Sequence, residues 1–456
     1  MVVFEQAQDV GGVWRANTYP GCACDVPAAL YSLSFAPNPW WSRTYAPQPE
    51  ILRYQRSVVD RLGLRPFIRF GCEVLSCSWD PSARRWRLRT SQGERSARVL
   101  VTALGGLAVP SVPAIPGLES FPGRLVHTAD WNDADLAGRR VAVVGTGASA
   151  IQIVPQLQAT ADSLVVYQRT PAWVLPRRDH AYPAAVQRMF AAVPVTQRAL
   201  RLATYLALEA RATAFVREPA LMRVAEARAM AFLEREVAEP ELRDRLTPRY
   251  RLGCKRTLLS DDWYRALTQP NVSVVTAALE QVRGSTLVGA DDSEHEVDAI
   301  VLATGFHVLD SPAWDMIVGR SGATLGQVFG DSPRAYKGTA VPGFPNLFLI
   351  TGPNTGLGHS SMIYMIESQV TYLVAALRGM RDHGVHDVEV RPEAVQRWNA
   401  DLDERLARTV WARGGCRSYY TDRTGRPSAV WPGSTVGFRA ATSRFDPGAY
   451  LLRGGR

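Results

Sequence analysis

Short apolar runs separated by turn-forming residues make up much of the chain, and this pattern predicts a mixed α/β protein. The apolar run at 141–144 fits a short buried strand. It is followed by the turn sequence GTGASA (145–150), a stretch with apolar residues at helical spacing, and a second apolar run at 164–167. A strand, a helix and a strand in this order predict a βαβ unit with parallel strands.

The same pattern separates further elements along the chain. Residues 186–245 are helical in pattern and include apolar side chains three and four residues apart, as in an amphipathic helix. These side chains are Met222, Ala225, Ala229, Phe232 and Leu233. Short runs broken by Asp80-Pro81 and Gly93 predict a β-meander that begins near Val74. Further strands are expected at 99–101, 272–275, 298–306 and 347–350, and a helix is expected from about Met362.

The turn at 145–150 has the spacing of a dinucleotide-binding loop. It fits G-x-G-x-x-A directly after a strand and directly before a helix. Gly145 allows the tight turn, Gly147 lets the backbone approach a pyrophosphate, and Ala150 allows the helix to pack close to the strand. The second strand ends in Gln168-Arg169, where an NAD-binding unit has an acid; an arginine there accommodates a 2′-phosphate. The unit is therefore predicted to bind NADP(H) rather than NAD.

The N-terminus predicts half of a second dinucleotide unit. A strand-like run at 2–4 ends in Glu5, and Gly11-Gly12 follow. An acid in this place binds the adenosine ribose about 20 residues after a glycine-rich turn. Two such units imply two nucleotides, and the usual pair is FAD with NADP(H). The expected fold is two Rossmann-like dinucleotide-binding domains, for FAD and NADP, with a helical insert and with the first βα unit of the FAD domain missing.

The expected domains follow from this arrangement. The FAD-binding domain begins at 1–135, the NADP-binding domain covers 136–305 with the helical insert at about 186–245, and 306–456 completes the FAD domain. Strand-to-glycine endings at 103–105 and 303–305 are predicted points at which the chain leaves one nucleotide domain for the other.

Composition and charge narrow the functional classes. The net charge is +9, but the basic residues are scattered, and among the 52 of them only Lys255 and Lys337 are lysines. We attribute this balance to general composition and predict no nucleic-acid partner. The six cysteines form no C-x-x-C and no histidine pair at ligand spacing accompanies them, so free thiols and no metal are expected. No membrane span and no signal peptide are predicted, which favours a cytoplasmic protein. Oligomeric state is not predicted.

The segment before the dinucleotide turn resembles a family fingerprint. FPGRLVHTADW (121–131) matches F-x-G-x-x-x-H-x-x-x-W, the fingerprint of Baeyer–Villiger monooxygenases, with Phe121, Gly123, His127 and Trp131 in register. The family usually has Pro or Asp after the tryptophan, whereas this chain has Asn132. The related flavin-containing monooxygenases carry Phe or Tyr in the tryptophan position, so the match favours the Baeyer–Villiger branch.

Further segments resemble the same family: 11–14, 19–35, 254–264 and 352–362. The resemblance implies that Asp25 lies beside the isoalloxazine, that Lys255 contacts the NADP 2′-phosphate, and that Arg256 is catalytic. The expected FAD-binding residues are Glu5, Gly11, Gly12, Val13, Trp14, Asp25, Tyr31, Val74, Asn354 and Met362. The expected NADP-binding residues are Ala23, Cys24, Asp25, Gly145, Thr146, Gly147, Ala148, Ser149, Ala150, Gln168, Arg169, Lys255 and Arg256.

The resemblance implies an NADPH- and FAD-dependent enzyme that inserts one oxygen atom of O₂ next to a ketone carbonyl and forms an ester or lactone. Arg256 would stabilise developing negative charge, because a guanidinium keeps its proton at working pH, and Asp25 would orient it. Two alternatives stay open: a monooxygenase that acts on sulfides or amines, and a truncated chain that cannot hold FAD. The ketone itself is not predicted.

Overall fold

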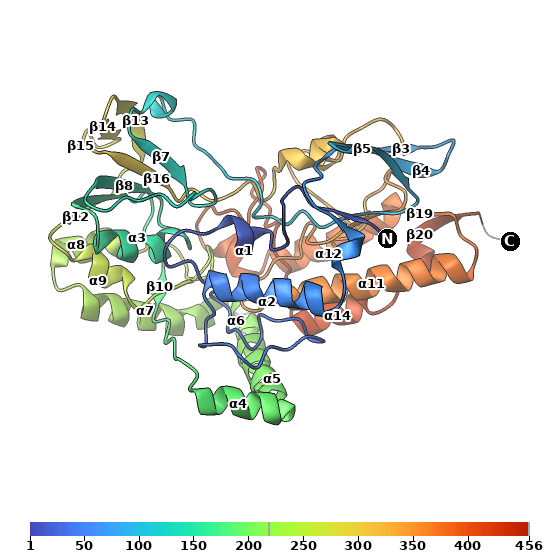
Figure 1. Ribbon diagram of the computed structural model, residues 1–456, viewed down its shortest axis with the longest axis horizontal. Coiled ribbons are helices and arrows are strands. Elements are labelled where there is room, and N and C mark those ends of the chain that lie inside the picture. Colours follow the sequence, from blue (N-terminus) through green and yellow to red (C-terminus); the bar gives the residue numbers. More distant parts are fainter. Residues whose placement is uncertain (218, 455–456) are drawn as a thin grey trace.

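Five parallel strands form the central sheet of one of two α/β lobes (Figure 1). In the computed structural model, which describes residues 1–217 and 219–454, the strands are β7 (Arg124–His127), β8 (Arg140–Val144), β9 (Ser163–Tyr167), β12 (Val272–Val275) and β16 (Ala299–Leu302). Their order is β12-β9-β8-β16-β7, and each neighbouring pair is parallel. The predicted βαβ unit is present, with α3 (Ala150–Gln158) between β8 and β9.

Successive side chains of these strands cover opposite faces of the sheet. Val141 and Val143 of β8 pack in one cluster with α3, α7 (Met222–Glu236) and α9 (Trp263–Leu267). Ala142 packs in another cluster with strands of a three-stranded antiparallel sheet. That sheet consists of β13 (Leu279–Arg283), β14 (Thr286–Gly289) and β15 (Glu294–Glu296). Both faces of the parallel sheet are therefore covered, as its nearly continuous apolar strands require.

The second lobe contains smaller sheets. One parallel pair joins β1 (Val3–Phe4) to β2 (Ile68–Arg69), and another joins β6 (Leu100–Thr102) to β18 (Leu347–Leu349). The predicted meander is β3 (Val74–Asp80), β4 (Arg85–Thr90) and β5 (Gly93–Ala97), with β17 (Ile317–Val318) added at its edge. β19 (Asp387–Val390) and β20 (Tyr450–Arg453) form an antiparallel pair. The predicted strands at 2–4, 99–101 and 347–350 thus lie in two separate parallel pairs.

Helices surround the sheets of the second lobe. α11 (Met362–Asp382) begins at the residue that the sequence predicts and packs on α14 (Thr435–Thr442). The remaining helices here are α1 (Val13–Ala16), α2 (Gln48–Arg61), α10 (Leu325–Phe329), α12 (Pro392–Leu406) and α13 (Val410–Arg413). Figure 1 shows α2 near the junction between the lobes and α11 at the lower right, below β19 and β20 in this view.

The predicted helical insert is present as five helices, α4 (Ala184–Ala192), α5 (Pro194–Ala210), α6 (Ala212–Val216), α7 and α8 (Pro240–Leu246). α4 and α5 project away from both lobes, whereas α7 and α8 lie along the first lobe (Figure 1). Met222, Ala229, Phe232 and Leu233 are buried, as their spacing predicts, while Ala225 is partly buried.

The position of β7 bears on the first domain boundary. The sequence places that boundary between 135 and 136, after this strand, but β7 pairs with β16 from Ala299↔Arg124 to Leu302↔His127. It is therefore an edge strand of the first lobe. We propose that the boundary lies before Arg124, and the other boundaries stay predictions.

No helix in the described ranges is both long and apolar enough to cross a membrane. The cytoplasmic location stays a prediction.

The central sheet should dominate the stability of the first lobe. Leu164 on β9 is fully buried, whereas Leu125 on β7 is 40% exposed. We expect Leu164→Ala to lower the free energy of unfolding by about 2–5 kcal/mol, because it leaves a cavity. Leu125→Ala should cost less than about 1 kcal/mol. Chemical denaturation of the two variants checks this, and equal losses would contradict the assigned burial of the sheet.

Candidate active site

Arg256 and Asp25 form an ion pair between two loops that lie far apart in the sequence. Arg256 Nε donates to Asp25 Oδ2 at 2.7 Å, and Nη2 donates to Oδ1 at 2.6 Å. The side chains are 27% and 24% exposed, respectively. Arg256 Nη1 faces the Leu357 carbonyl oxygen at 3.5 Å. A bidentate pair fixes the plane of the guanidinium and leaves its remaining N–H donors for another acceptor.

Backbone contacts hold both loops in place. Gln152 of α3 accepts a hydrogen bond from the Ala23 N–H at 3.3 Å and donates to the Ala23 carbonyl at 2.9 Å. Arg256 lies just before β11 (Leu258–Leu259), which pairs in parallel with β10 (Val174–Leu175). Both members of the ion pair are therefore positioned by regular secondary structure: α3 for Asp25 and the β10–β11 pair for Arg256.

The ion pair shifts the pKa of both groups in the direction that keeps them charged. Burial raises the pKa of Asp25, but the charge and hydrogen bonds of Arg256 outweigh burial and hold it below its ordinary value. The charge of Asp25 holds the pKa of Arg256 well above its ordinary value. Arg256 is therefore a permanent cation at neutral pH.

The turn after β8 has the geometry that its sequence predicts. Gly145 has φ +114°, and a Cβ there would lie 2.6 Å from the Ala303 carbonyl oxygen, so a larger residue does not fit. A Cβ at Gly147 would have no neighbour within 4 Å, so the backbone there is open to a ligand. Ala150 is fully buried at the start of α3.

The other residues of the predicted NADP site differ in their hydrogen bonds and in their exposure to solvent. Thr146 Oγ1 donates to the Thr170 carbonyl at 3.0 Å, and Ser149, after Ala148, occupies the N-cap position of α3. Gln168 is buried and donates to the Arg245 carbonyl at 2.8 Å, so its side chain holds the insert rather than facing solvent. Arg169 is exposed.

Lys255 lines a cavity of about 420 Å³ whose wall includes Thr170, the residue that accepts the hydrogen bond of Thr146. Its Nζ lies 5.0 Å from the ring centre of Tyr250. Burial, and then the nearby positive charge of Arg169, lower the pKa of Lys255. No carboxylate among the described residues pairs with either cation. Two like charges without a counter-ion favour the binding of an anion between them.

The predicted flavin-side residues of the N-terminal region lie around α1. Gly11 and Gly12 precede this helix, and Val13 begins it. Trp14 Nε1 donates to the Tyr31 hydroxyl at 2.9 Å, and the two rings meet edge to face.

Further predicted flavin residues lie outside this helix. Glu5 directly follows β1, and its Oε1 accepts from the Ala7 N–H at 2.8 Å. Cys24, a predicted NADP contact, is buried next to Asp25.

Asn354 and Met362 lie on the segment that leads into α11. Asn354 Nδ2 donates to the carbonyls of Pro427 and Val430 at 3.0 and 2.9 Å. Its Oδ1 is buried without a hydrogen-bond partner in the described structure. Met362 begins α11 after the N-cap Ser361.

The structure does not join Val74 to the ion pair. Val74 begins β3 and packs against the core of the meander, which contains Trp79 and Trp86. Its assignment to the flavin site has no structural support among these contacts and stays a prediction.

Comparisons with known proteins decide the family. The profile of a family described as "Flavin-binding monooxygenase-like" matches residues 1–318. A Baeyer–Villiger monooxygenase of Streptomyces coelicolor is 49% identical over 453 residues, which cover 99% of this chain and 87% of that protein. A Baeyer–Villiger monooxygenase of Pseudomonas aeruginosa is 42% identical over 454 residues, which cover 99% and 86%. This chain belongs to the Baeyer–Villiger monooxygenase family.

Solved structures of two monooxygenases agree with the fold. A steroid monooxygenase bound to NADP superposes with a TM-score of 0.86 at 31% identity, covering 100% of this chain and 94% of the other. A closed cyclohexanone monooxygenase superposes with a TM-score of 0.87 at 26% identity and the same coverage. The predicted two-nucleotide fold and the predicted flavin-dependent monooxygenase class are confirmed.

The Baeyer–Villiger fingerprint lies where β7 joins the first lobe. Trp131 is buried in the core cluster that contains α3, and Phe121 is buried on the opposite face of the sheet. His127 ends β7, and its Nδ1 accepts from the Ala129 N–H at 3.1 Å. Burial lowers the pKa of His127, which favours the neutral imidazole. These contacts give the fingerprint a structural role in joining the linker to the sheet.

The prediction that all six cysteines are free thiols is wrong for two of them. Cys254 and Cys416 form a disulfide, while Cys22, Cys24, Cys72 and Cys77 are free and buried. The two partners are 162 residues apart. Spacing along the sequence carries no signal for such a pair, since only the fold brings the segments together.

Sequence reasoning also missed the residues that follow Cys416. Tyr420 is buried near Arg256, and its hydroxyl has no hydrogen-bond partner among the described residues. It adds a polar group beside the ion pair.

Gly123 of the fingerprint has no room for a side chain. A Cβ there would lie 2.3 Å from the Asp298 carbonyl oxygen and 2.6 Å from the Phe121 ring. We expect Gly123→Ala to displace β7 from β16 and lower the melting temperature by several degrees, since overpacking costs about 1–3 kcal/mol. Gly379→Ala on α11 is the matched control, because its Cβ would make only an ordinary 3.8 Å contact. Equal melting temperatures for the two variants would contradict the assigned packing.

Proposed function

We propose that this chain uses NADPH and FAD to insert one oxygen atom of O₂ next to the carbonyl of a ketone, and that Arg256 and Asp25 carry the oxygenation step. The observation that carries the assignment of residues is the bidentate Arg256–Asp25 pair, whose arginine directly follows Lys255 on the wall of the 420 Å³ cavity. When bound, the flavin supplies activation of O₂ and NADPH supplies the reducing hydride.

The residues around the 145–150 turn fit NADPH. The open backbone at Gly147 gives access to a pyrophosphate at the start of α3. Lys255 and Arg169 supply positive charge without a carboxylate partner among the described residues, which suits a 2′-phosphate. These features support the predicted preference for NADPH over NADH.

Fewer residues with a visible fit to a cofactor lie on the predicted FAD side than on the NADPH side. Glu5 stands at the end of β1 with one carboxylate oxygen bound to Ala7 and the other available for a ribose hydroxyl. The unpartnered, buried Oδ1 of Asn354 is an acceptor that a bound group with an N–H donor would satisfy. These two positions support the predicted use of FAD.

Arg256 supplies the electrostatic part of catalysis. Its guanidinium is held in one plane by Asp25 before any substrate arrives, so its free N–H donors need no reorganisation when negative charge develops on an oxygen atom. Asp25 keeps the arginine oriented and offsets part of the cost of its burial. The pair thus binds and orients, and neither side chain needs to lose or gain a proton.

The chemistry of the substrate is a carbonyl group in an organic ketone. Solved relatives are described as acting on or binding a steroid and cyclohexanone. For this chain we propose a ketone as the substrate and do not name a particular ketone.

Removal of the guanidinium should separate the two half-reactions. In Arg256→Ala we expect the rate of ester or lactone formation to fall by about 10²–10³-fold, because a preorganised charge at the reacting oxygen is lost. Reduction of the bound flavin by NADPH under anaerobic conditions should change much less. Product analysis and stopped-flow absorbance measure these two steps, with Arg265→Ala, an exposed ion-paired arginine on α9, as the control. Unchanged ester formation in Arg256→Ala would overturn the role of Arg256.

Gly147→Ala should separate stability from cofactor binding. Its Cβ would meet no protein atom within 4 Å, so the melting temperature should stay within about 2 °C of the parent chain. The added methyl group would stand where the pyrophosphate approaches. We therefore expect the Kd for NADP⁺, measured by isothermal titration calorimetry, to rise at least tenfold. Unchanged affinity would contradict the position of the dinucleotide on this turn.

A further inference from the structure

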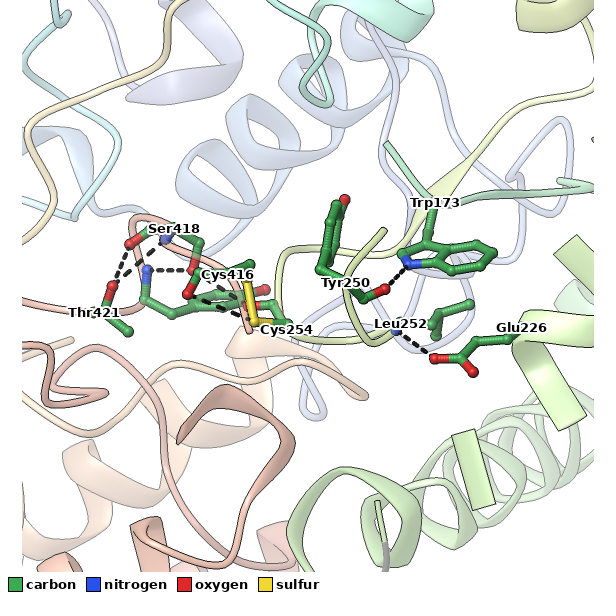
Figure 2. The surroundings of a disulfide bond; sticks show 9 residues. Trp173, Glu226, Tyr250, Leu252, Cys254, Cys416, Ser418 and Thr421 are labelled. Carbon is green, nitrogen blue, oxygen red and sulfur yellow. Dashed lines mark hydrogen bonds between the residues drawn. A yellow bond between two sulfur atoms is a disulfide. The ribbon is translucent and has the colours of Figure 1, made fainter. Parts of the chain in front are cut away.

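The Cys254–Cys416 disulfide joins the segment that carries Lys255 to a segment near the C-terminus (Figure 2). Two hydrogen bonds run beside it. The Arg251 N–H donates to the Gly414 carbonyl at 2.9 Å, and Ser418 Oγ donates to the Cys254 carbonyl at 3.3 Å. Residues 414–418, named here the clamp segment, are therefore fixed against 251–254 at several points.

The first of these segments is itself anchored to Trp173 and to α7 of the insert. Trp173 Nε1 donates to the Tyr250 carbonyl at 2.7 Å, and the Leu252 N–H donates to Glu226 Oε1 at 2.9 Å (Figure 2). Glu226 also pairs with Arg251 at 2.6 Å. The disulfide thus attaches the clamp segment to a rigid base rather than to a free loop.

The clamp segment contributes a second cation to the cavity of Lys255. Lys255 directly follows Cys254 and Arg417 directly follows Cys416, and both residues line the 420 Å³ cavity. Cys254 and Cys416 have Cα atoms only 6.1 Å apart. The bond therefore joins the residues that immediately precede the two cations.

Arg417 has no counter-ion in the described structure. It is exposed, and no carboxylate of the described residues lies within ion-pair distance of it. Arg249 on the same cavity wall is different, because it pairs with Asp244 at 3.4 Å. A guanidinium that faces a cavity already containing Lys255, without a carboxylate partner, raises the local positive potential.

We propose that Arg417, held by the Cys254–Cys416 disulfide, is a specificity-determining residue that binds the 2′-phosphate of NADPH together with Lys255. The inference rests on the proposed use of NADPH. It adds a residue from the C-terminal part of the chain to a site otherwise built from the first lobe and its insert. A planar guanidinium and a phosphate form two parallel hydrogen bonds, so Arg417 discriminates by geometry as well as by charge.

The disulfide acts as a positioning device in this arrangement. Without the S–S bond, the clamp segment keeps the Arg251–Gly414 and Ser418–Cys254 hydrogen bonds but gains freedom at Cys416, next to Arg417. The loss of affinity should then be smaller than the loss caused by removing Arg417 itself, because the cation is present but less well held.

Binding of two small probes to the 456-residue chain tests the inference without turnover. Adenosine 2′,5′-bisphosphate carries the 2′-phosphate, and adenosine 5′-monophosphate does not. By isothermal titration calorimetry we expect Arg417→Ala to raise the Kd of the bisphosphate about tenfold or more and to leave the Kd of the monophosphate within about twofold. Arg423→Ala is the matched control, because Arg423 is exposed and pairs with Asp331 at 3.5 Å.

The disulfide is tested in the same assay. Cys416→Ser should raise the Kd of the bisphosphate about threefold. Dithiothreitol reduces the cystine with two electrons and two protons and is itself oxidised to its cyclic disulfide. Treatment of the parent chain with dithiothreitol should therefore also raise the Kd of the bisphosphate about threefold. If the serine variant does not fold, the reduced parent chain provides the measurement without the disulfide.

The possible results of these titrations separate three claims: the use of NADPH, the role of Arg417 and the role of the disulfide. If the parent chain binds both probes equally, the use of NADPH itself is contradicted and the role of Arg417 fails with it. If the parent prefers the bisphosphate but Arg417→Ala keeps that preference, only the role of Arg417 is overturned. If Arg417→Ala loses the preference while Cys416→Ser and the reduced parent keep it in full, the positioning role of the disulfide is overturned.

Discussion

The ion pair between Arg256 and Asp25 is the interaction on which the rest of the site depends. A partly buried guanidinium without a partner would be costly, and a partly buried carboxylate without one would be costly too. Each loop therefore stabilises the charge that the other presents. The hydrogen bonds of Gln152 to Ala23, and the pairing of β11 with β10, keep the loops in the register that the pair requires. The proposed catalytic group, Arg256, is thus positioned by the fold itself.

The basic residues of the chain differ in their surroundings. Most of the basic residues are arginines spread over the chain, and many of them form exposed ion pairs. The two lysines are different. Lys255 lines the 420 Å³ cavity, and Lys337 is buried beside the rings of Tyr336 and Tyr372. Burial lowers the pKa of both lysines. What distinguishes Lys255 from Lys337 is its place on the wall of the cavity.

The features predicted from sequence are those set by local pattern. The GTGASA turn, the strand on either side of α3 and the start of α11 at Met362 follow from apolar spacing and glycine positions within a few residues. The Arg256–Asp25 pair was implied by resemblance, because its members are 231 residues apart. Three features were not predicted: the cystine, the place of β7 in the first sheet, and the hydrogen bond from Gln168 to the Arg245 carbonyl. Each depends on contacts between distant segments, which no local pattern encodes.

The central claim is that Arg256 and Asp25 act as one unit in oxygenation. A double-mutant cycle on kcat/KM for ester formation, with Arg256→Gln, Asp25→Asn and the double variant, measures their coupling most directly. Because each single change leaves a partly buried charge without its partner, the two effects should be strongly non-additive, with a coupling free energy of about 2 kcal/mol or more. Additive effects of the two substitutions, with a coupling free energy near zero, would contradict the account.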